Sequence, residues 1–164
     1  MHVTPAVVAD EREWVRERAP VVVPLVNETR EHLAEQFDAD VAAIEVEEYR
    51  EAVDAVFADG DLAVNVAALV RLLRDLDVEN DYPGFVVDEL LARELAGMIA
   101  GTQPLRLLGE ATFHYADVVI DDEDGASGGP AGLDDLDAAL AAGFQTRLPG
   151  WSWTETESPF AVSE

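Results

Sequence analysis

Apolar side chains recur at helical spacing through the first hundred residues of the chain. Spacings of three and four residues place such side chains on one face of a helix, where they can be buried together. The clearest stripe consists of Leu62, Val66, Leu69, Leu73 and Leu76. The pattern predicts helices over residues 5–18, 24–37, 41–58, 62–76 and about 85–100.

Capping residues and prolines support these helix boundaries. Thr4 can cap the first helix, and Pro5 suits its first position. Pro20 is expected to stop that helix, and Pro24 to open the next one. Asp40 can cap the third helix.

After Gly101 the chain becomes rich in residues that favour strands. Strands are expected over residues 112–120, 144–148 and 151–156, with a short helix marked by Leu133, Leu136 and Leu140. The fold class expected is therefore α+β, mainly α. About five N-terminal helices would pack with a small C-terminal antiparallel β element and the short helix.

The length suits a single globular domain, expected over residues 1–157. Its helical part would be residues 1–101 and its strand-containing part residues 102–157. Residues 158–164 are expected to form a loose C-terminal tail.

The charge of the chain says more about the conditions in which it folds than any sequence motif does. The chain has 35 acidic residues against 10 basic ones, no lysine, and a formal net charge of −25. Residues 1–55 carry 14 acids, residues 56–110 carry 10 and residues 111–164 carry 11, so the charge does not form an acidic tail. Such charge repels itself unless salt screens it. The composition resembles that of cytoplasmic proteins from halophiles that accumulate salt, and it predicts a cytoplasmic location.

The same composition excludes several classes of function. Direct nucleic-acid binding needs clustered cations, which this chain lacks. Without cysteine and lysine there can be no disulfide, thiolate nucleophile or lysine Schiff base. We find no targeting segment, membrane span or nucleotide-binding loop, and we expect neither a cofactor nor a membrane partner.

His114 is the strongest catalytic candidate, because a histidine can act as a general base near neutral pH. Asp117 lies nearby, but strand alternation would place it on the opposite face. A half-buried, hydrogen-bonded strand residue is the simpler interpretation of His114.

The acidic run that contains Asp121, Asp122 and Asp124 invites a calcium interpretation. An EF-hand loop would need oxygen ligands where Ile120 and Ala131 stand, so the motif fails. A looser site for hydrated cations at these three aspartates stays open beside the simpler interpretation, a solvated loop.

Two helix faces carry weaker signals. Glu28, His32 and Glu35 share one face, but no second helix supplies the ligands of a di-iron site. Ala92, Ala96 and Ala100, with Gly97 and Gly101, form a small-residue strip that suits either close packing within the chain or self-association.

Trp151 and Trp153 would share one face of a strand, close to Arg147. Tryptophan and arginine are common anchors of protein interfaces, so these three residues form a candidate binding surface. The alternative is that both indoles cover the small-residue core of the domain itself.

The sequence thus favours a non-catalytic protein-interaction or regulatory module, with a protein partner or a second copy of the chain as its ligand. One alternative is a small hydrolase or isomerase-like enzyme, with or without a metal ion, that uses His114. Another is an acidic mimic of nucleic acid that occupies the binding site of a basic protein.

The charge predicts that folding depends on salt. Raising KCl from about 0.1 M to about 1 M shortens the Debye length from roughly 10 Å to roughly 3 Å, so the melting temperature should rise. Circular dichroism melts over a KCl series measure this. An undiminished cooperative melt in dilute buffer with chelator would contradict the prediction.

Overall fold

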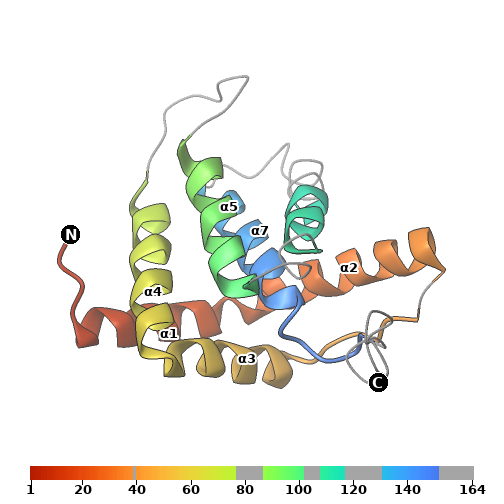
Figure 1. Cartoon of the computed structure of the whole chain (residues 1–164), viewed down its shortest axis with the longest axis horizontal. Helices are drawn as coiled ribbons and strands as arrows, with labels where there is room; N and C mark the ends of the chain where they lie inside the picture. The colour runs from red at the N-terminus through yellow and green to blue at the C-terminus, as the bar shows by residue number, and fades with distance from the viewer. Residues whose placement is uncertain (39, 77–86, 102–107, 117–130, 152–164) are drawn as a thin grey trace, which may run out of the picture.

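The computed structural model describes residues 1–38, 40–76, 87–101, 108–116 and 131–151. Its helices include α1 (Pro5–Glu17), α2 (Ala19–Phe37), α3 (Val46–Ala58), α4 (Gly60–Asp75), α5 (Val87–Ala100) and α7 (Ala131–Gln145). Residues 108–116 form a further helix. Helices α1 and α2 follow one another along the long axis, and α4 and α5 stand across them (Figure 1).

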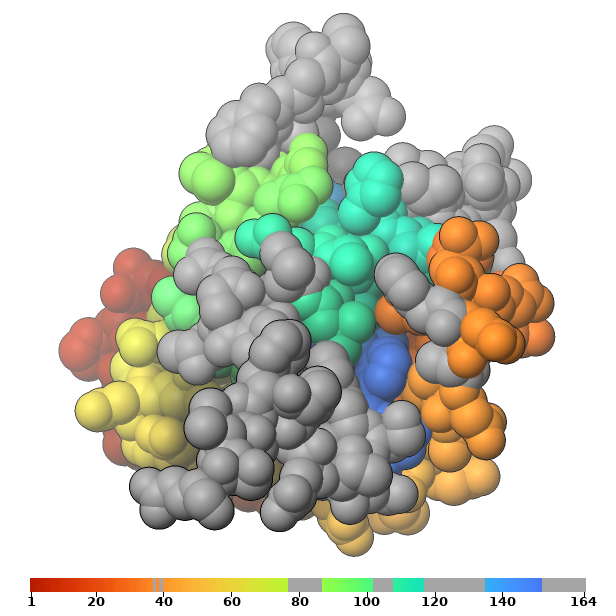
Figure 2. Space-filling model, turned by 45° about the vertical axis from the view of Figure 1, so that its right-hand side comes forward, coloured from red at the N-terminus to blue at the C-terminus, as the bar shows by residue number. Residues whose placement is uncertain are grey.

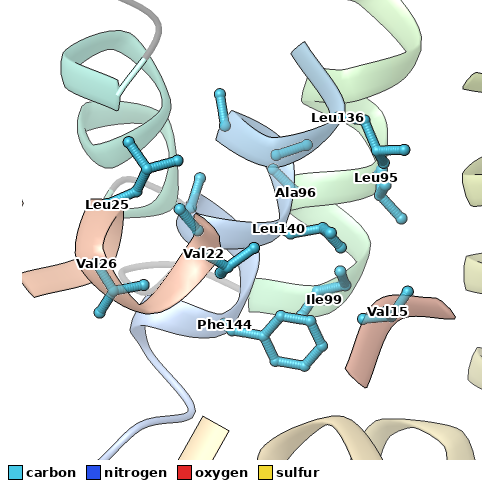
Figure 3. Close-up of a cluster of buried hydrophobic side chains, with 14 of the residues drawn as sticks. Val15, Val22, Leu25, Val26, Leu95, Ala96, Ile99, Leu136, Leu140 and Phe144 are labelled. Atoms are coloured by element: carbon cyan, nitrogen blue, oxygen red, sulfur yellow. The ribbon is translucent and has the colours of Figure 1, made fainter. Parts of the chain in front are cut away.

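Helix α7 occupies the centre of the molecule. Every residue from Leu136 to Gln145 is buried, so this stretch has no solvated face. Figure 3 shows Leu136, Leu140 and Phe144 of α7 among apolar side chains of α1, α2 and α5. A helix that is buried on all sides needs neighbours on all sides, and the surrounding helices provide them.

Small residues let α5 and α7 approach closely. A Cβ atom added at Gly143 of α7 would lie 2.7 Å from the Cβ of Ile99. The alanines of the small-residue strip, Ala92, Ala96 and Ala100, are buried. The strip therefore faces the interior of its own chain.

An ion pair between the half-buried Arg18 and the buried Asp137 joins α7 to the junction between α1 and α2. Arg18 donates from Nε and Nη2 to the two carboxylate oxygens of Asp137, at 3.0 and 2.5 Å. Burial raises the pKa of the Asp137 carboxyl, while the hydrogen bond and positive charge of Arg18 act in the opposite direction. The pair fixes the position of α7 because a lone buried charge would be strongly unfavourable.

The structure contradicts the α+β prediction, since every regular element in the described ranges is a helix. Residues 112–116 of the first expected strand belong to the helix over 108–116, and residues 117–120 lie outside the described part. Gly109, Thr112, Phe113 and Ala116 are buried at helical spacing. The Thr112 hydroxyl donates to the Leu108 carbonyl at 2.9 Å, which accommodates a β-favouring residue in a helix.

The second expected strand is wrong for a related reason. Phe144 and Gln145 complete α7, and the chain then turns through residues 146–149. Trp151 forms one isolated antiparallel bridge, and its partner is Val41, not a neighbouring strand. Residues 152–156 and the expected tail lie outside the described residues.

Proline positions explain a further difference in the helix boundaries. Thr4 caps α1 as predicted, accepting from the Val7 amide at 3.2 Å. Pro20 lies in the first turn of α2, where a missing N–H is tolerated, because α2 begins at Ala19. Pro24 lies inside α2 on its exposed side, where water can bond the carbonyl left free.

The close α5–α7 contact generates a stability prediction. Gly143→Ala should lower the free energy of unfolding, because overpacking costs roughly 1–3 kcal/mol and exceeds the helix-propensity gain of up to about 1 kcal/mol. Gly60→Ala is the matched control, since nothing lies within 4 Å of a Cβ added there. Urea unfolding at fixed high KCl compares the two, and equal stabilities would contradict the packing of α5 on α7.

Candidate functional site

A groove of about 630 Å³ lies between the outer face of α2 and the segment that follows it. Its lining from α2 and that segment consists of Pro24, Asn27, Glu28, Arg30, Glu31, Ala34, Glu35, Asp40, Val41 and Ala43. The volume is within the usual range of ligand sites. We call this feature the acidic groove.

Four exposed carboxylates, those of Glu28, Glu31, Glu35 and Asp40, line the acidic groove. None of them belongs to an ion pair within the described residues. Four negative charges without ion pairs therefore gather on one side of α2.

The direction of α2 adds to this charge. The C-terminal end of a helix carries a partial negative charge, which basic side chains normally offset. The last turn of α2 has no basic residue, and the residue that caps the helix is Asp38, whose φ of 49° is left-handed. The acidic groove therefore attracts cations through its carboxylates and through the helix end together.

The segment from Asp40 to Glu45 is fixed against α2. The side-chain amide of Asn27 donates to the Ile44 carbonyl at 3.1 Å and accepts from the Ile44 amide at 2.8 Å. The Ala42 amide donates to the Gly150 carbonyl at 3.4 Å. One wall of the groove is thus held in place by contacts on both sides of the segment.

Arg30 holds this region together from beneath. Its side chain is only 1% exposed, and its Nη1 donates to the carbonyls of Ala42 and Pro149, each at 2.6 Å. Its Nε donates to the Gln145 side chain at 2.6 Å, and its guanidinium lies 5.1 Å from the centre of the Trp151 ring. Burial lowers the pKa of Arg30 to about 10, an effect that the charge of Glu48 partly offsets.

Gly150 permits this close approach. Its φ of +104° is unfavourable for residues with a side chain. A Cβ there would lie 2.7 Å from Nη1 of Arg30 and 2.9 Å from the Ala42 carbonyl oxygen. The chain passes so near Arg30 only because this residue is glycine.

The described arginines, which are all of them except Arg106, are engaged in contacts within the chain. Arg71 and Arg74 bond the fully buried Glu11, and Arg93 bonds Glu89. The others that bond carboxylates are Arg12, Arg16, Arg18 and Arg50. Arg30 is the one arginine among the described residues that line the groove, and it is buried and bonds neutral groups. None of the described arginines forms an ion pair with a groove carboxylate.

The candidate binding residues are placed as follows. Trp151 is 9% exposed, and its indole N–H donates to the Gln145 carbonyl at 2.9 Å. Nε of Arg147 donates to the Ile99 carbonyl at 2.6 Å. Trp153 lies outside the described residues. Trp151 and Arg147 thus make their described contacts within the chain, and a surface with paired indoles stays a prediction.

The candidate catalytic and metal residues are only partly described. His114 is exposed on the helix over 108–116 and does not line the acidic groove. Asp117, Asp121, Asp122 and Asp124 lie outside the described residues. Within the ranges that are described, no group of three or more histidines and carboxylates could hold a metal ion.

His32 has a packing role. Its ring stacks on Tyr115 with centroids 4.1 Å apart and planes at 16°, which joins α2 to the helix over 108–116. Figure 2 shows that helix on the surface beside α2, with α7 set deeper between them. Burial raises the pKa of the Tyr115 hydroxyl, and the charges of Glu28, Glu35 and Glu31 act in the same direction.

Sequence reasoning missed the acidic groove and the role of Arg30. A signal for Arg30 exists: it follows the buried Val22 and Val26 at steps of four, so it occupies an apolar position of α2. No comparable signal marks the groove, because its second wall is fixed by contacts with residues 145–151.

Arg30 provides a test of this architecture. Arg30→Met should lower the free energy of unfolding by about 2–3 kcal/mol, because the Gln145 side-chain oxygen and the facing carbonyls lose their donors. Arg12→Met is the matched control and should change it by less than about 1 kcal/mol, because the Arg12–Asp54 pair is exposed. Urea unfolding at constant KCl measures both variants. Equal losses of unfolding free energy would show that the contacts of Arg30 stabilise the fold no more than an exposed ion pair does.

Comparisons with known proteins place the chain in a family. None of the described helices has both the length and the apolar character needed to cross a membrane. No curated protein and no solved structure matches the chain. A family model, the domain of unknown function DUF7984, matches residues 1–164. The chain therefore belongs to the DUF7984 family.

Proposed function

We propose that this protein is a non-catalytic interaction or regulatory module, and that its acidic groove binds a basic segment of a partner protein. The observation that carries the proposal is the set of four exposed carboxylates without ion pairs, gathered along one groove. Because no described arginine pairs with these carboxylates, we propose that a partner supplies the matching positive charge. The groove is a different surface from the one expected around Trp151, Trp153 and Arg147, which stays a separate prediction.

The size and lining of the groove suit a peptide. Its α2 wall runs from Pro24 to Glu35, which corresponds to roughly 17 Å at about 1.5 Å per residue. That length accommodates about five extended residues. Pro24, Ala34 and Val41 offer apolar surface against which the stems of arginine or lysine could pack while their charged ends meet the carboxylates.

The acidic composition supports a setting of concentrated salt, such as a halophilic cytoplasm. In such salt, electrostatic attraction over more than about 3 Å is screened, so a partner must contact the carboxylates directly. A groove with adjacent polar and apolar surfaces allows such contact, whereas a diffuse acidic surface does not. The same argument favours a structured binding site over simple mimicry of nucleic-acid charge.

An enzymatic role for His114 has less support. A catalytic base needs a pocket and groups that converge on a substrate, and His114 is exposed on a helix outside the acidic groove. The interaction role therefore ranks above the hydrolase or isomerase alternative.

Replacing three groove carboxylates tests the proposal. The probe is a synthetic peptide of about four Arg-Val repeats, which spans roughly 27 Å when extended. The triple variant Glu28→Gln, Glu31→Gln, Glu35→Gln should weaken its binding about tenfold, because each exposed ion pair with the peptide contributes about 0.5 kcal/mol. Isothermal titration calorimetry at fixed KCl measures the change.

The control variant changes the same net charge elsewhere. Glu17, Glu51 and Glu94 are exposed, lie on α1, α3 and α5, and do not line the groove. Their replacement by glutamine should leave peptide binding within about twofold, an allowance for long-range charge. Equal losses in both triple variants, or no binding by the wild-type protein, would reject the groove as the binding site.

A further inference from the structure

We infer that the basic segment binds as an added β-strand along the chain segment 41–43, whose outer edge has no backbone partner among the described residues. This inference rests on the proposed function and specifies how the partner is recognised. An extended peptide would pair its backbone with Val41 and Ala43 and place its cationic side chains near the carboxylates of α2.

The antiparallel bridge between Val41 and Trp151 defines the two edges of this segment. In an antiparallel pair, backbone groups of successive residues point to opposite edges. The Ala42 amide bonds Gly150 and the Ala42 carbonyl accepts from Arg30, so the groups of Ala42 point to the inner edge. The backbone amides and carbonyls of Val41 and Ala43 therefore point to the outer edge.

The outer edge is available for pairing. Neither the amide nor the carbonyl of Val41 or Ala43 has a hydrogen bond in the described part of the chain. The same two residues line the acidic groove, whereas Ala42 does not. An unpaired edge of this kind is a template for another strand.

The edge is also prepared for binding. Asn27 holds Ile44, and Arg30 and Gly150 hold Ala42, so the residues on either side of Ala43 are fixed before any ligand arrives. A rigid edge loses little conformational freedom on binding. This favours pairing over capture by a flexible acidic loop.

Strand addition also reconciles the charge with concentrated salt. Screening weakens ion pairs at the rim, but backbone hydrogen bonds are neutral and persist. The carboxylates would then select a basic sequence, while the backbone pairing would supply affinity.

Peptides with methylated backbone nitrogens test this inference on the wild-type protein. Two versions of the Arg-Val repeat peptide are compared, one N-methylated at every arginine and the other at every valine. In an added strand only alternate N–H groups face the edge, so one version should lose at least about tenfold in affinity and the other should lose much less. Titration in about 1 M KCl keeps ion pairing screened.

A protein variant provides a second readout. Ala43→Pro removes the outward N–H and should weaken binding of the unmodified peptide, whereas Ala43→Val retains that N–H and should not. Melting temperatures of both variants establish that they fold. If Ala43→Pro does not fold, the N-methylated peptides alone decide.

The outcomes separate the two proposals. If the unmodified peptide does not bind, the proposed function fails. If it binds and both N-methylated versions bind alike, whether tightly or weakly, the strand mode is overturned and the groove binds by charge alone. A linear tetra-amine that competes as strongly as the peptide would overturn it in the same way.

Discussion

The burial of α7 on every side is the constraint on which the rest of the structure depends. From Leu136 to Gln145 this helix has no solvated face, and five of its residues there are alanine or glycine, which lets the neighbouring helices approach closely. Small side chains bury little area each, so a core of this kind needs close packing from several directions. Buried polar contacts at Asp137 and Gln145 then fix the helix, because each requires one particular arginine.

Those contacts determine where the few cations of the chain can be. Arg18 and Arg30 hold α7, while Arg71 and Arg74 surround Glu11 at the contact of α1 with α4. The described arginines contact other groups of the chain, and 35 acidic residues outnumber 10 basic ones, so the surface of the protein is acidic. The acidic groove, the binding site that we propose, thus follows in part from the way arginines hold the core together.

The sequence predicted features that neighbouring residues determine, and it failed for features that depend on contacts between distant parts of the chain. The Thr4 cap and the apolar stripe of α4 are set by neighbouring residues, and both were predictable. The central helix was underestimated, because burial on all sides removes the polar face that helical periodicity reveals. Residues 112–116 were misread because strand propensity outweighed a helical spacing that was present in the sequence. The groove was not predictable, since residues 145–151 position one of its walls.

The charges of α2 conflict with the stability of that helix. A sequence selected only to hold α2 would place lysine or arginine in its last turn, but this chain has Glu31, Glu35 and Asp38 around it and no basic residue there. In concentrated salt the conflict is small, because the repulsion acts over only about 3 Å. The carboxylates can therefore remain without much loss of folding stability. In the proposed function they would still select basic side chains that come into direct contact with them. This balance fits the proposed ligand, a basic segment that would contact the carboxylates directly and gain its affinity from neutral backbone and apolar contacts.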